Sequence, residues 1–586
     1  MKRLIQISLL LGMAPMLFGQ NYKGSQDLPS QFSNSLVDVI IQLNTNPGSA
    51  AFQNQLNLIQ NMVQQSGPQL GPQLGPQQGQ QQGQQHGPPA FHHISALHLK
   101  VPAVLIPWLK ANPAVRYISP NRPNTKFLDI TTASVGASSA WQSGLDGSGV
   151  GVAVIDSGVA LMHDLTGANG VTSRVVDSEN FATGMTDATD QYGHGTHVAG
   201  IIGSSGKDST GPNFTRTFKG MAPNVNIVSL RVLDANGAGY DADVIAAIER
   251  AIDLKSVYNI RVINLSLGRP VFESYTLDPL CQAVEAAWQA GIVVVTAAGN
   301  YGRDNSLGTQ GYGTIASPGN DPYVITVGAM NARGTPYTSD DVIASYSSRG
   351  PTLVDHIMKP DLVAPGNQVV SLMAPNSTLA SEFPKTLIPI SMYETGVSGA
   401  SSKYFRLSGT SMATPVVSGA AALLIQQHPS LTPDQVKGRL MKTATKALNL
   451  YTVATDALTF QQYSNQSDIF TVGAGYLNVT AALTNNDLVT LPALSPAIVQ
   501  NPVTKKFGIL RNFSIIWGDS IIWGDSAVFG NIVFSHLSIS ATDDSILWGD
   551  SVLWGDSAMT GYSVLWGDSV NGTSGLSALS EGDDDE

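Results

Sequence analysis

Short apolar runs alternate with amphipathic stretches between about residues 130 and 483. The strand candidates are residues 152–155, 225–230, 262–265, 292–297 and 324–327, and helical spacing occurs at 241–255 and 278–290. Continuous apolar strands separated by helices are typical of a parallel sheet covered on both faces. The pattern therefore predicts an α/β fold with a mostly parallel central sheet.

A smaller pattern precedes this one. Residues 36–46 alternate as in a strand, residues 52–63 have helical spacing, and further strand-like or helix-like stretches occupy 94–101, 103–111 and 115–118. Residues 64–89 are rich in Gln, Gly and Pro, so they cannot build a core and are predicted to be a disordered insertion. We expect a small α+β unit, split by this insertion.

The first residues have the pattern of a signal peptide. Lys2 and Arg3 precede an apolar run over residues 4–18, and Gly19 is a small residue suited to a cleavage site. This run is short for a membrane span, and no later segment is long enough. The sequence predicts a signal peptide over residues 1–20, no transmembrane segment, and a protein that is secreted or associated with the cell surface.

The negative charge is confined to one end of the chain. The sequence has 43 acidic and 31 basic residues, and twelve of the acids follow Arg511, after which no Lys or Arg occurs. The preceding part is formally neutral. Because no basic patch stands out, nucleic acid is not expected as a partner.

Cys281 is the only cysteine, so an intrachain disulfide is impossible. It lies in an apolar helical stretch, which predicts a small core residue in preference to a reactive thiol.

Four segments have the residues needed to hydrolyse a peptide bond. Asp156 directly follows a predicted buried strand, and His194 begins a helix of small residues. Ser411 lies at a helix start, where Pro415 is tolerated and the backbone N–H groups are free to bind an anion. Asn300 follows another strand and offers a side-chain amide. An acid, a base, a nucleophile and an oxyanion donor are thus all available.

These segments, in the order Asp, His, Ser, resemble those of the subtilisin-like serine peptidases. Flanking segments are similar too, including residues 220–223, 264–268, 345–351 and 359–366. The resemblance implies a secreted serine endopeptidase that works through an acyl-enzyme, with Asp156, His194 and Ser411 as the triad. It also implies an oxyanion hole formed by Asn300 and by the backbone N–H of Ser411.

The resemblance further implies how peptides bind. Substrate would pair as a strand with two edge segments, Gly237, Ala238 and Gly239 on one side and Ser266, Leu267 and Gly268 on the other. Glycine allows the two backbones to approach. An apolar residue is expected before the scissile bond.

The resemblance also divides the chain. Residues 21–126 would be a propeptide that assists folding, inhibits the enzyme and ends in the active site until it is cut. Residues 127–485 would be the peptidase domain and 486–586 an acidic tail. Residues 367–403 look longer than in compact relatives and are expected to shape the cleft. No cofactor is needed for catalysis; calcium often stabilises the family, but no ligand loop is evident, so no metal ligand is assigned.

Two other histidines could be assigned a chemical role. His197 is a rival base, but we expect it to pack or to form a hydrogen bond instead. His163 and the adjacent Asp164 suggest a surface turn more than a metal site.

Other functions fit the sequence less well. A glycine-rich loop at 147–151 precedes its strand, so it does not fit a dinucleotide site. An esterase is disfavoured because only His428 and His536 follow Ser411. The main alternative is an inactive family member that binds peptides or surfaces.

The tail repeats Trp-Gly-Asp-Ser five times, beginning at Trp517, Trp523, Trp548, Trp554 and Trp566. A six-residue frame keeps equivalent residues on one face of a strand, and Gly-Asp suits a turn. This predicts a small stacked β repeat. Whether the tail packs on itself, packs on the peptidase domain, or contacts a cell surface or polymer stays open.

Overall fold

The structure is a computed structural model. It describes Leu28, residues 36–46, 49–65, 91, 95–120, 123–126, 132, 134–306, 308–500, 507–510, 538–539, 546–549, 553–554, 557–558 and 582–583. The predicted signal peptide, residues 66–89 of the predicted insertion, and Trp517, Trp523 and Trp566 lie outside these residues. Helix α1 reaches Gln65, so the first two residues of the predicted insertion are helical.

The central sheet has the predicted α/β architecture. Its order is β13-β12-β11-β9-β5-β7-β6, with β14 also beside β12, and every pairing is parallel except that of β13 with β12. The strands are β5 (Gly151–Asp156), β6 (Val175–Asn180), β7 (Asn226–Arg231), β9 (Ile260–Leu265), β11 (Val293–Ala297), β12 (Ile325–Asn331), β13 (Val342–Ile343) and β14 (Leu362–Pro365). All five predicted strands are confirmed. Their nearly complete burial explains why they read as continuous apolar runs.

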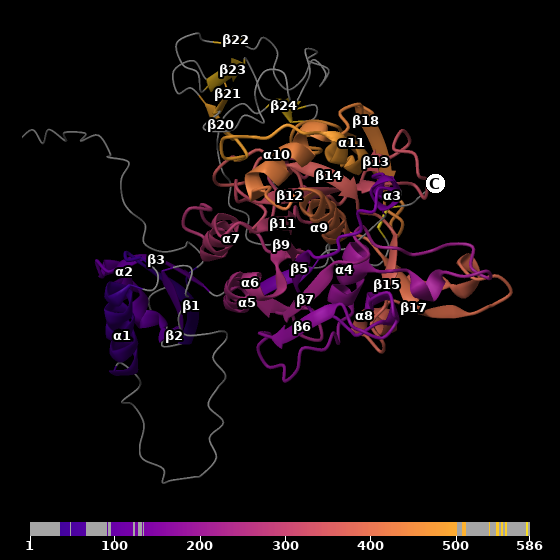
Figure 1. Cartoon of the computed structure of the whole chain (residues 1–586). Helices are drawn as coiled ribbons and strands as arrows, with labels where there is room; N and C mark the ends of the chain where they lie inside the picture. Colours follow the sequence, from indigo (N-terminus) through magenta and orange to yellow (C-terminus); the bar gives the residue numbers. More distant parts are fainter. Residues whose placement is uncertain are drawn as a thin grey trace, which may run out of the picture.

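Two pairs of helices pack against the sheet (Figure 1). One pair is α5 (Asp241–Asp253) and α7 (Pro279–Gln289), and the other is α4 (His194–Gly203) and α9 (Thr410–Gln427). The helix predicted over 241–255 ends at Asp253 and is followed by the short α6 (Lys255–Tyr258), which ends at Asn259 in the left-handed conformation. The remaining helices of this domain are α3 (Ala137–Gln142), α8 (Thr378–Glu382), α10 (Pro433–Thr443) and α11 (Val479–Thr484).

The domain also contains smaller antiparallel sheets. Strands β15 (Val369–Leu372), β17 (Ala400–Leu407) and β16 (Leu387–Pro389) form an antiparallel sheet, and β18 (Tyr451–Thr455) forms a hairpin with β19 (Gln462–Gln466). Residues beyond 485 still pack on the core: Ala493 and Ile498 are buried in it, and the Met358 N–H donates to the carbonyl of Pro496 over 2.8 Å.

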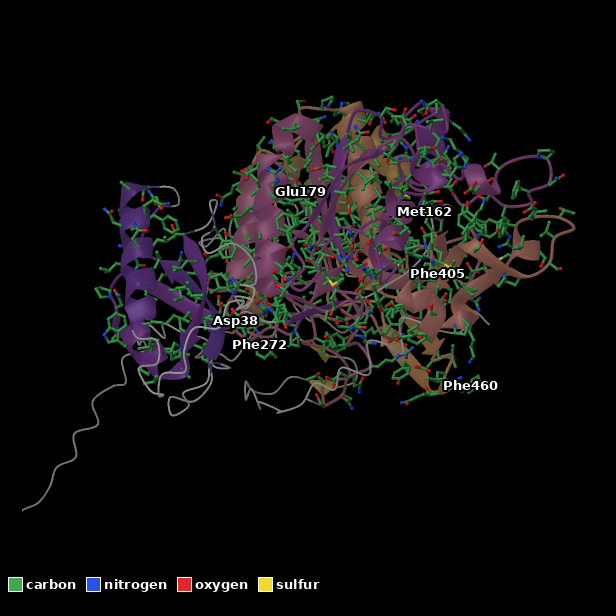
Figure 2. The ribbon with its side chains drawn as sticks, turned by 90° about the horizontal axis from the view of Figure 1, so that it is seen from below. Asp38, Met162, Glu179, Phe272, Phe405 and Phe460 are labelled. Atoms are coloured by element: carbon green, nitrogen blue, oxygen red, sulfur yellow. The ribbon has the colours of Figure 1, made fainter. Side chains whose placement is uncertain are left out.

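The amino-terminal unit is α+β, as the pattern predicts. Its antiparallel sheet has the order β2-β1-β3, formed by β1 (Leu36–Leu43), β2 (Ala96–Pro102) and β3 (Val115–Pro120), with helices α1 (Ala50–Gln65) and α2 (Ile106–Ala111). This unit has its own apolar core. It lies beside the larger domain in Figure 1, and Figure 2 shows Asp38 on the side that faces that domain.

The unit contacts the larger domain at α7. The Gln282 side-chain amide donates to Gln42 Oε1 over 2.7 Å, and Gln42 in turn donates to the carbonyl of Leu277. Gln42 is buried although it is polar, which marks this as a packed interface. Beside it a cavity of about 460 Å³ is lined by residues of both parts, among them Arg116 and Glu285.

The described parts of the tail are short antiparallel strands. The order β20-β21-β23-β22 joins β20 (Ala497–Gln500), β21 (Phe507–Leu510), β22 (Ser538–Ile539) and β23 (Ile546–Gly549), while β24 (Leu553–Trp554) pairs with β25 (Ser557–Ala558). Trp548 and Trp554 therefore lie in strands, but the register does not reveal a regular stack. Among the described residues, no helix is long and apolar enough to cross a membrane.

Candidate active site

Asp156 and His194 meet at the carboxyl end of the central sheet. Asp156 is the last residue of β5, His194 is the first residue of α4, and both side chains are fully buried. Asp156 Oδ1 lies 2.6 Å from His194 Nδ1 and also accepts from the N–H of Ser157 over 2.7 Å. Because a carboxylate accepts, Nδ1 bears the proton and Nε2 is left as the basic nitrogen.

A second aspartate, not identified from the sequence, organises this pair. Asp190 accepts from the Ser157 hydroxyl over 2.8 Å, the Gly193 N–H over 2.7 Å and the Thr196 N–H over 2.8 Å. Burial raises the pKa of Asp190, and these donors oppose that effect. Asp190 thus connects, through hydrogen bonds, the residue after Asp156 with the residues around His194. The only sequence signal was an acid four residues before the histidine.

Gly195 permits the close approach of these two segments. A Cβ at this position would lie 2.1 Å from the carbonyl oxygen of Gly158. The start of α4 therefore requires glycine to reach β5.

The insertion over residues 367–403 supports the His194 loop from the other side. The N–H groups of Thr378 and Leu379 donate to the carbonyls of Gln191 and Tyr192 over 3.0 and 3.1 Å. The Ser371 hydroxyl donates to the carbonyl of His197 over 2.8 Å. The structure thus places this insertion against the histidine loop.

Ser411 lies in the first turn of α9 and exchanges hydrogen bonds with Ser266. Its hydroxyl donates to the carbonyl of Ser266 over 2.9 Å, and the Ser266 hydroxyl donates to the carbonyl of Ser411 over 2.7 Å. Helices α4 and α9 pack against each other, and each has its candidate residue at its amino-terminal end. Gly419, eight residues after Ser411, lies beside the carbonyl of Ile202, eight residues after His194. The two helices therefore run side by side in the same direction, which brings their amino-terminal ends to the same region.

Asn300 presents an amide donor at this location. Its Oδ1 accepts from the N–H and the hydroxyl of Thr410 over 2.9 and 3.1 Å, and the Thr410 hydroxyl accepts from the N–H of Gly299 over 3.1 Å. Asn300 Nδ2 is buried and has no hydrogen-bond partner in the part of the chain that the structure describes. Burial of an amide N–H without an acceptor costs free energy, so this position is suited to a ligand that offers an acceptor. Thr410, missed in the sequence, fixes this orientation.

The predicted peptide-binding edges hold a strand of the chain itself. Strand β4 (Pro123–Lys126) lies between β8 (Gly239–Tyr240) and β10 (Leu267–Gly268), antiparallel to both. Leu267 pairs with Lys126 and Gly268 with Thr125. Gly237 and Ala238 instead close a turn, in which the Asp234 N–H donates to the carbonyl of Ala238 over 2.7 Å.

An ion-paired arginine holds the β10 edge. Arg269, which follows Gly268, donates to both oxygens of Asp241 at 3.0 and 3.1 Å and to both oxygens of Asp278 at 2.8 and 2.9 Å. Arg269 is 2% exposed and both carboxylates are fully buried. Asp278 also caps α7. The network therefore links the edge strand to helices α5 and α7.

His197, the rival base, occupies a packing position. Its Nε2 lies 3.1 Å from the carbonyl oxygen of Val369, and its ring meets Phe405, labelled in Figure 2, edge to face at 5.1 Å. Burial, with a further contribution from His194, lowers the pKa of His197 to about 3. It is therefore neutral near pH 7.

His163, Asp164 and Asp208 form the one cluster with metal-ligating side chains found among the described residues. Its acceptors already have protein donors: Asp164 accepts from the Tyr404 hydroxyl over 2.6 Å and from the Asp208 N–H over 2.7 Å, and Lys403 Nζ lies 3.2 Å from Asp208. This arrangement does not fit a calcium site, for which oxygen ligands must be free.

Cys281 is buried as predicted, 3.3 Å from Asn320 Oδ1, and burial raises the pKa of its thiol.

Comparisons with known proteins identify the family. Residues 147–473 match the Subtilase family. Serine protease AprX of Bacillus subtilis (strain 168) is 39% identical over 367 residues, which cover 61% of this chain and 75% of that protein. Subtilisin DY of Bacillus licheniformis is 34% identical over 340 residues (58% and 92%), and subtilisin E of Bacillus subtilis (strain 168) is 33% identical over 358 residues (61% and 77%). The chain belongs to the subtilase family and is a serine-type endopeptidase.

Proposed function

We propose that Ser411, His194 and Asp156 form the catalytic triad of a secreted endopeptidase. The Ser411 hydroxyl exchanges its hydrogen bond to Ser266 for one to His194 Nε2, loses its proton there and attacks the substrate carbonyl carbon. His194 then donates the proton to the leaving amine as the C–N bond breaks, and water hydrolyses the acyl-enzyme by the same route. Asp156 holds the imidazole by its 2.6 Å contact with Nδ1.

The observation that carries this proposal is the Asn300 amide. Nδ2 is buried and has no partner among the described residues, while Thr410 at the start of α9 holds the other end of the same side chain. We assign the oxyanion hole to this amide and to the backbone N–H of Ser411 in the first turn of α9, where N–H groups have no intrahelical acceptor.

An active-site-directed fluorophosphonate probe tests the assignment. The mature protein should be labelled at Ser411, and the Ser411→Ala variant should not be labelled. His194→Ala should slow labelling strongly. Absence of labelling in the correctly folded mature protein would favour the alternative of an inactive peptide-binding or surface-binding member.

We also propose that residues 21–126 belong to a propeptide that occupies the cleft and that the chain cuts itself one residue further on, after Phe127. Support comes from β4, which pairs with Gly239 and with Leu267 and Gly268 as a peptide substrate would. Strand β4 ends at Lys126, the partner of Leu267, and the carbonyl of the preceding Ser266 accepts from the Ser411 hydroxyl. Because this pairing leads β4 towards the nucleophile, we place the cut after the next residue in the sequence, Phe127. The assignment fits an apolar residue before the scissile bond.

Sequencing the amino terminus of the secreted product tests this register. Leu128 should be the first residue, and the Ser411→Ala variant should stay uncut. A different mature start that also depends on Ser411 would overturn the register but not the triad. Export itself rests on the signal-like residues 1–20, and loss of secretion on their deletion would support it.

A further inference from the structure

A short segment far beyond the family match lies buried in the peptidase domain. Gly582 and Asp583 are both buried, and the Asp583 side chain is fully covered. Their partners are Arg303, Ser345, Asn367, Gln368 and Ser408, which come from four separate segments of the domain. No feature of the tail sequence predicts this contact.

The carboxylate of Asp583 is bound by a cationic side chain and by hydrogen-bond donors. Arg303 Nη2 lies 2.9 Å from Oδ1, and the Ser345 N–H donates to Oδ2 over 2.7 Å. The Ser345 hydroxyl donates to Oδ1 as well. Arg303 is itself positioned by Asp456, at the tip of the β18–β19 hairpin that Phe460 marks in Figure 2. Hydrogen bonds between charged groups are the stronger class, so this pocket is suited to an aspartate.

The backbone of Asp583 is held in both directions. Its N–H donates to Asn367 Oδ1 over 2.8 Å, and its carbonyl accepts from Asn367 Nδ2 over 2.9 Å and from Gln368 Nε2 over 3.1 Å. A single asparagine side chain that pairs with both backbone groups recognises a peptide in one register.

The preceding position accepts only glycine. Gly582 has φ of +67°, and a Cβ there would lie 2.1 Å from Ser408 Oγ and 2.4 Å from Asn367 Oδ1. Both the backbone conformation and the lack of space exclude a side chain. Together with the carboxylate contacts, the pocket selects the dipeptide Gly-Asp.

The pocket is built from residues that are close in sequence to the candidate active-site residues. Arg303 is three residues after Asn300, and Ser408 is three residues before Ser411. The Gly409 N–H donates to the carbonyl of Gly366 over 2.9 Å, and the Tyr346 hydroxyl donates to the same carbonyl over 2.6 Å. A ligand in the pocket therefore contacts the segment that follows Asn300 and the segment that precedes Ser411.

We propose that this pocket is a binding site for a Gly-Asp peptide, filled in cis by Gly582 and Asp583, which anchors the far end of the tail to the peptidase domain. The near end is fixed as well, because the Ala493 N–H donates to Asp434 Oδ1 over 2.7 Å. The tail is thus a loop closed at both ends on the peptidase domain. The site does not depend on the catalytic assignments.

Peptide binding to an opened pocket tests the proposal. In a Ser411→Ala background, deletion of residues 582–586 should expose the site to a fluorescein-labelled peptide, Ser-Glu-Gly-Asp-Asp. We expect saturable binding to the deletion variant and binding at least about tenfold weaker to the full chain, whose own segment competes. Two altered peptides, one with Ala at the position of Gly582 and one with Asn at the position of Asp583, should bind the deletion variant at least about tenfold more weakly than the parent peptide does. Equal binding of the three peptides to a folded deletion variant would overturn it.

A second measurement uses the full chain, in case the deletion variant does not fold. Hydrogen exchange should show protected amides at Ser345 and Asp583 in the Ser411→Ala protein, with faster exchange at both in Asp583→Asn. The matched control is Asp487→Asn, because Asp487 is paired with Lys442 but is 62% exposed. If Asp583→Asn leaves both amides as protected as the control does, the carboxylate is not what holds the segment, and the proposal fails.

Discussion

Individual hydrogen bonds at the start of α9 decide how well the Asn300 amide is aimed. The Thr410 hydroxyl bridges the Gly299 N–H and Asn300 Oδ1, so it connects the end of β11 to the helix that begins beside Ser411. In the proposed site, one end of the Asn300 side chain accepts hydrogen bonds from Thr410, and the other end would donate to the substrate. We therefore expect Thr410 to act as a positioning residue, through Asn300.

Thr410→Val keeps the shape of the side chain but removes this bridge. We expect kcat to fall about three- to tenfold with KM nearly unchanged, because the lost hydrogen bonds orient an amide that acts mainly in the transition state. Thr410→Ser retains the hydroxyl and should restore most of kcat. Steady-state kinetics on a peptide substrate measures both values, and equal kcat for the valine and serine variants would contradict the positioning role.

Helix α4 depends on a neutral histidine. His197 packs between the carbonyl of Val369 in β15 and the ring of Phe405 in β17, and its pKa of about 3 lies far below the ordinary 6.5. Between these pH values the unfolded chain binds the proton and the folded chain does not. Folding stability contributed by this site is therefore full above pH 6.5 and is lost as the pH falls towards 3.

His197→Gln should remove this part of the pH dependence. Within the window the parent protein should lose up to about 1.4 kcal/mol of unfolding free energy per pH unit from this site. Urea unfolding of the Ser411→Ala protein with and without His197→Gln, from pH 7 to 4, gives the two free energies of unfolding. Their difference removes the titration of carboxylates, which both proteins share. If the two free energies change equally with pH, His197 is not neutral in the folded state.

Two bidentate arginines provide a matched comparison at the level of elements. Arg269 joins β10 to α5 and α7 with 2% exposure, whereas Arg250 on α5 pairs with Glu179 on β6 with 40% and 29% of the two side chains exposed. Removal of a buried partner leaves uncompensated charges, while an exposed pair is screened by water.

Arg269→Leu should therefore lower the free energy of unfolding by about 3–5 kcal/mol and raise KM, because the buried Asp241 and Asp278 lose their partner and the β10 edge loosens. Arg250→Leu should cost less than about 1 kcal/mol. Denaturant unfolding in the Ser411→Ala background measures both. Similar small losses for the two variants would show that the Arg269 network is dispensable.

Across the whole molecule, two segments that lie outside the family match pack into the peptidase domain. Strand β4 lies between β8 and β10, and Gly582 with Asp583 contacts the segment that follows Asn300 and the segment that precedes Ser411. The amino-terminal unit is kept in place by a separate contact at α7, where the buried Gln42 exchanges hydrogen bonds with Gln282 and Leu277. The cleft strand and the docked unit thus have different attachments.

Gln42→Ala should weaken the attachment at α7 without opening the fold of the amino-terminal unit. After processing, we expect a smaller share of that unit to remain with the peptidase domain in size-exclusion chromatography, since the variant leaves the Gln282 amide and the Leu277 carbonyl without this partner. Gln53→Ala, an exposed position on α1, is the control. Equal retention of the two variants would show that the Gln42 hydrogen bonds do not hold the unit in place.

Much of the arrangement followed from local sequence. The buried strands and the helices at α5 and α7 were predicted because burial on both faces and helical periodicity leave direct marks on a chain. The α/β fold was predicted from the alternation of these strands and helices, and the family was predicted because Asp156, His194, Asn300 and Ser411 occupy short, ordered motifs. The small α+β unit was also predicted from alternation and helical spacing, and its contact with α7 was not.

The tertiary structure decided which side chains serve the predicted groups. Asp190, Thr410 and Arg269 look in sequence like ordinary polar residues, and their functions arise from partners brought close by the fold. The pairing of Pro123–Lys126 between two edges and the burial of Gly582 with Asp583 likewise depend on surfaces assembled from several segments. A periodic pattern reflects which face of a single helix or strand is buried. A contact between distant segments forms only when the chain folds and brings them together, so no local pattern predicts it.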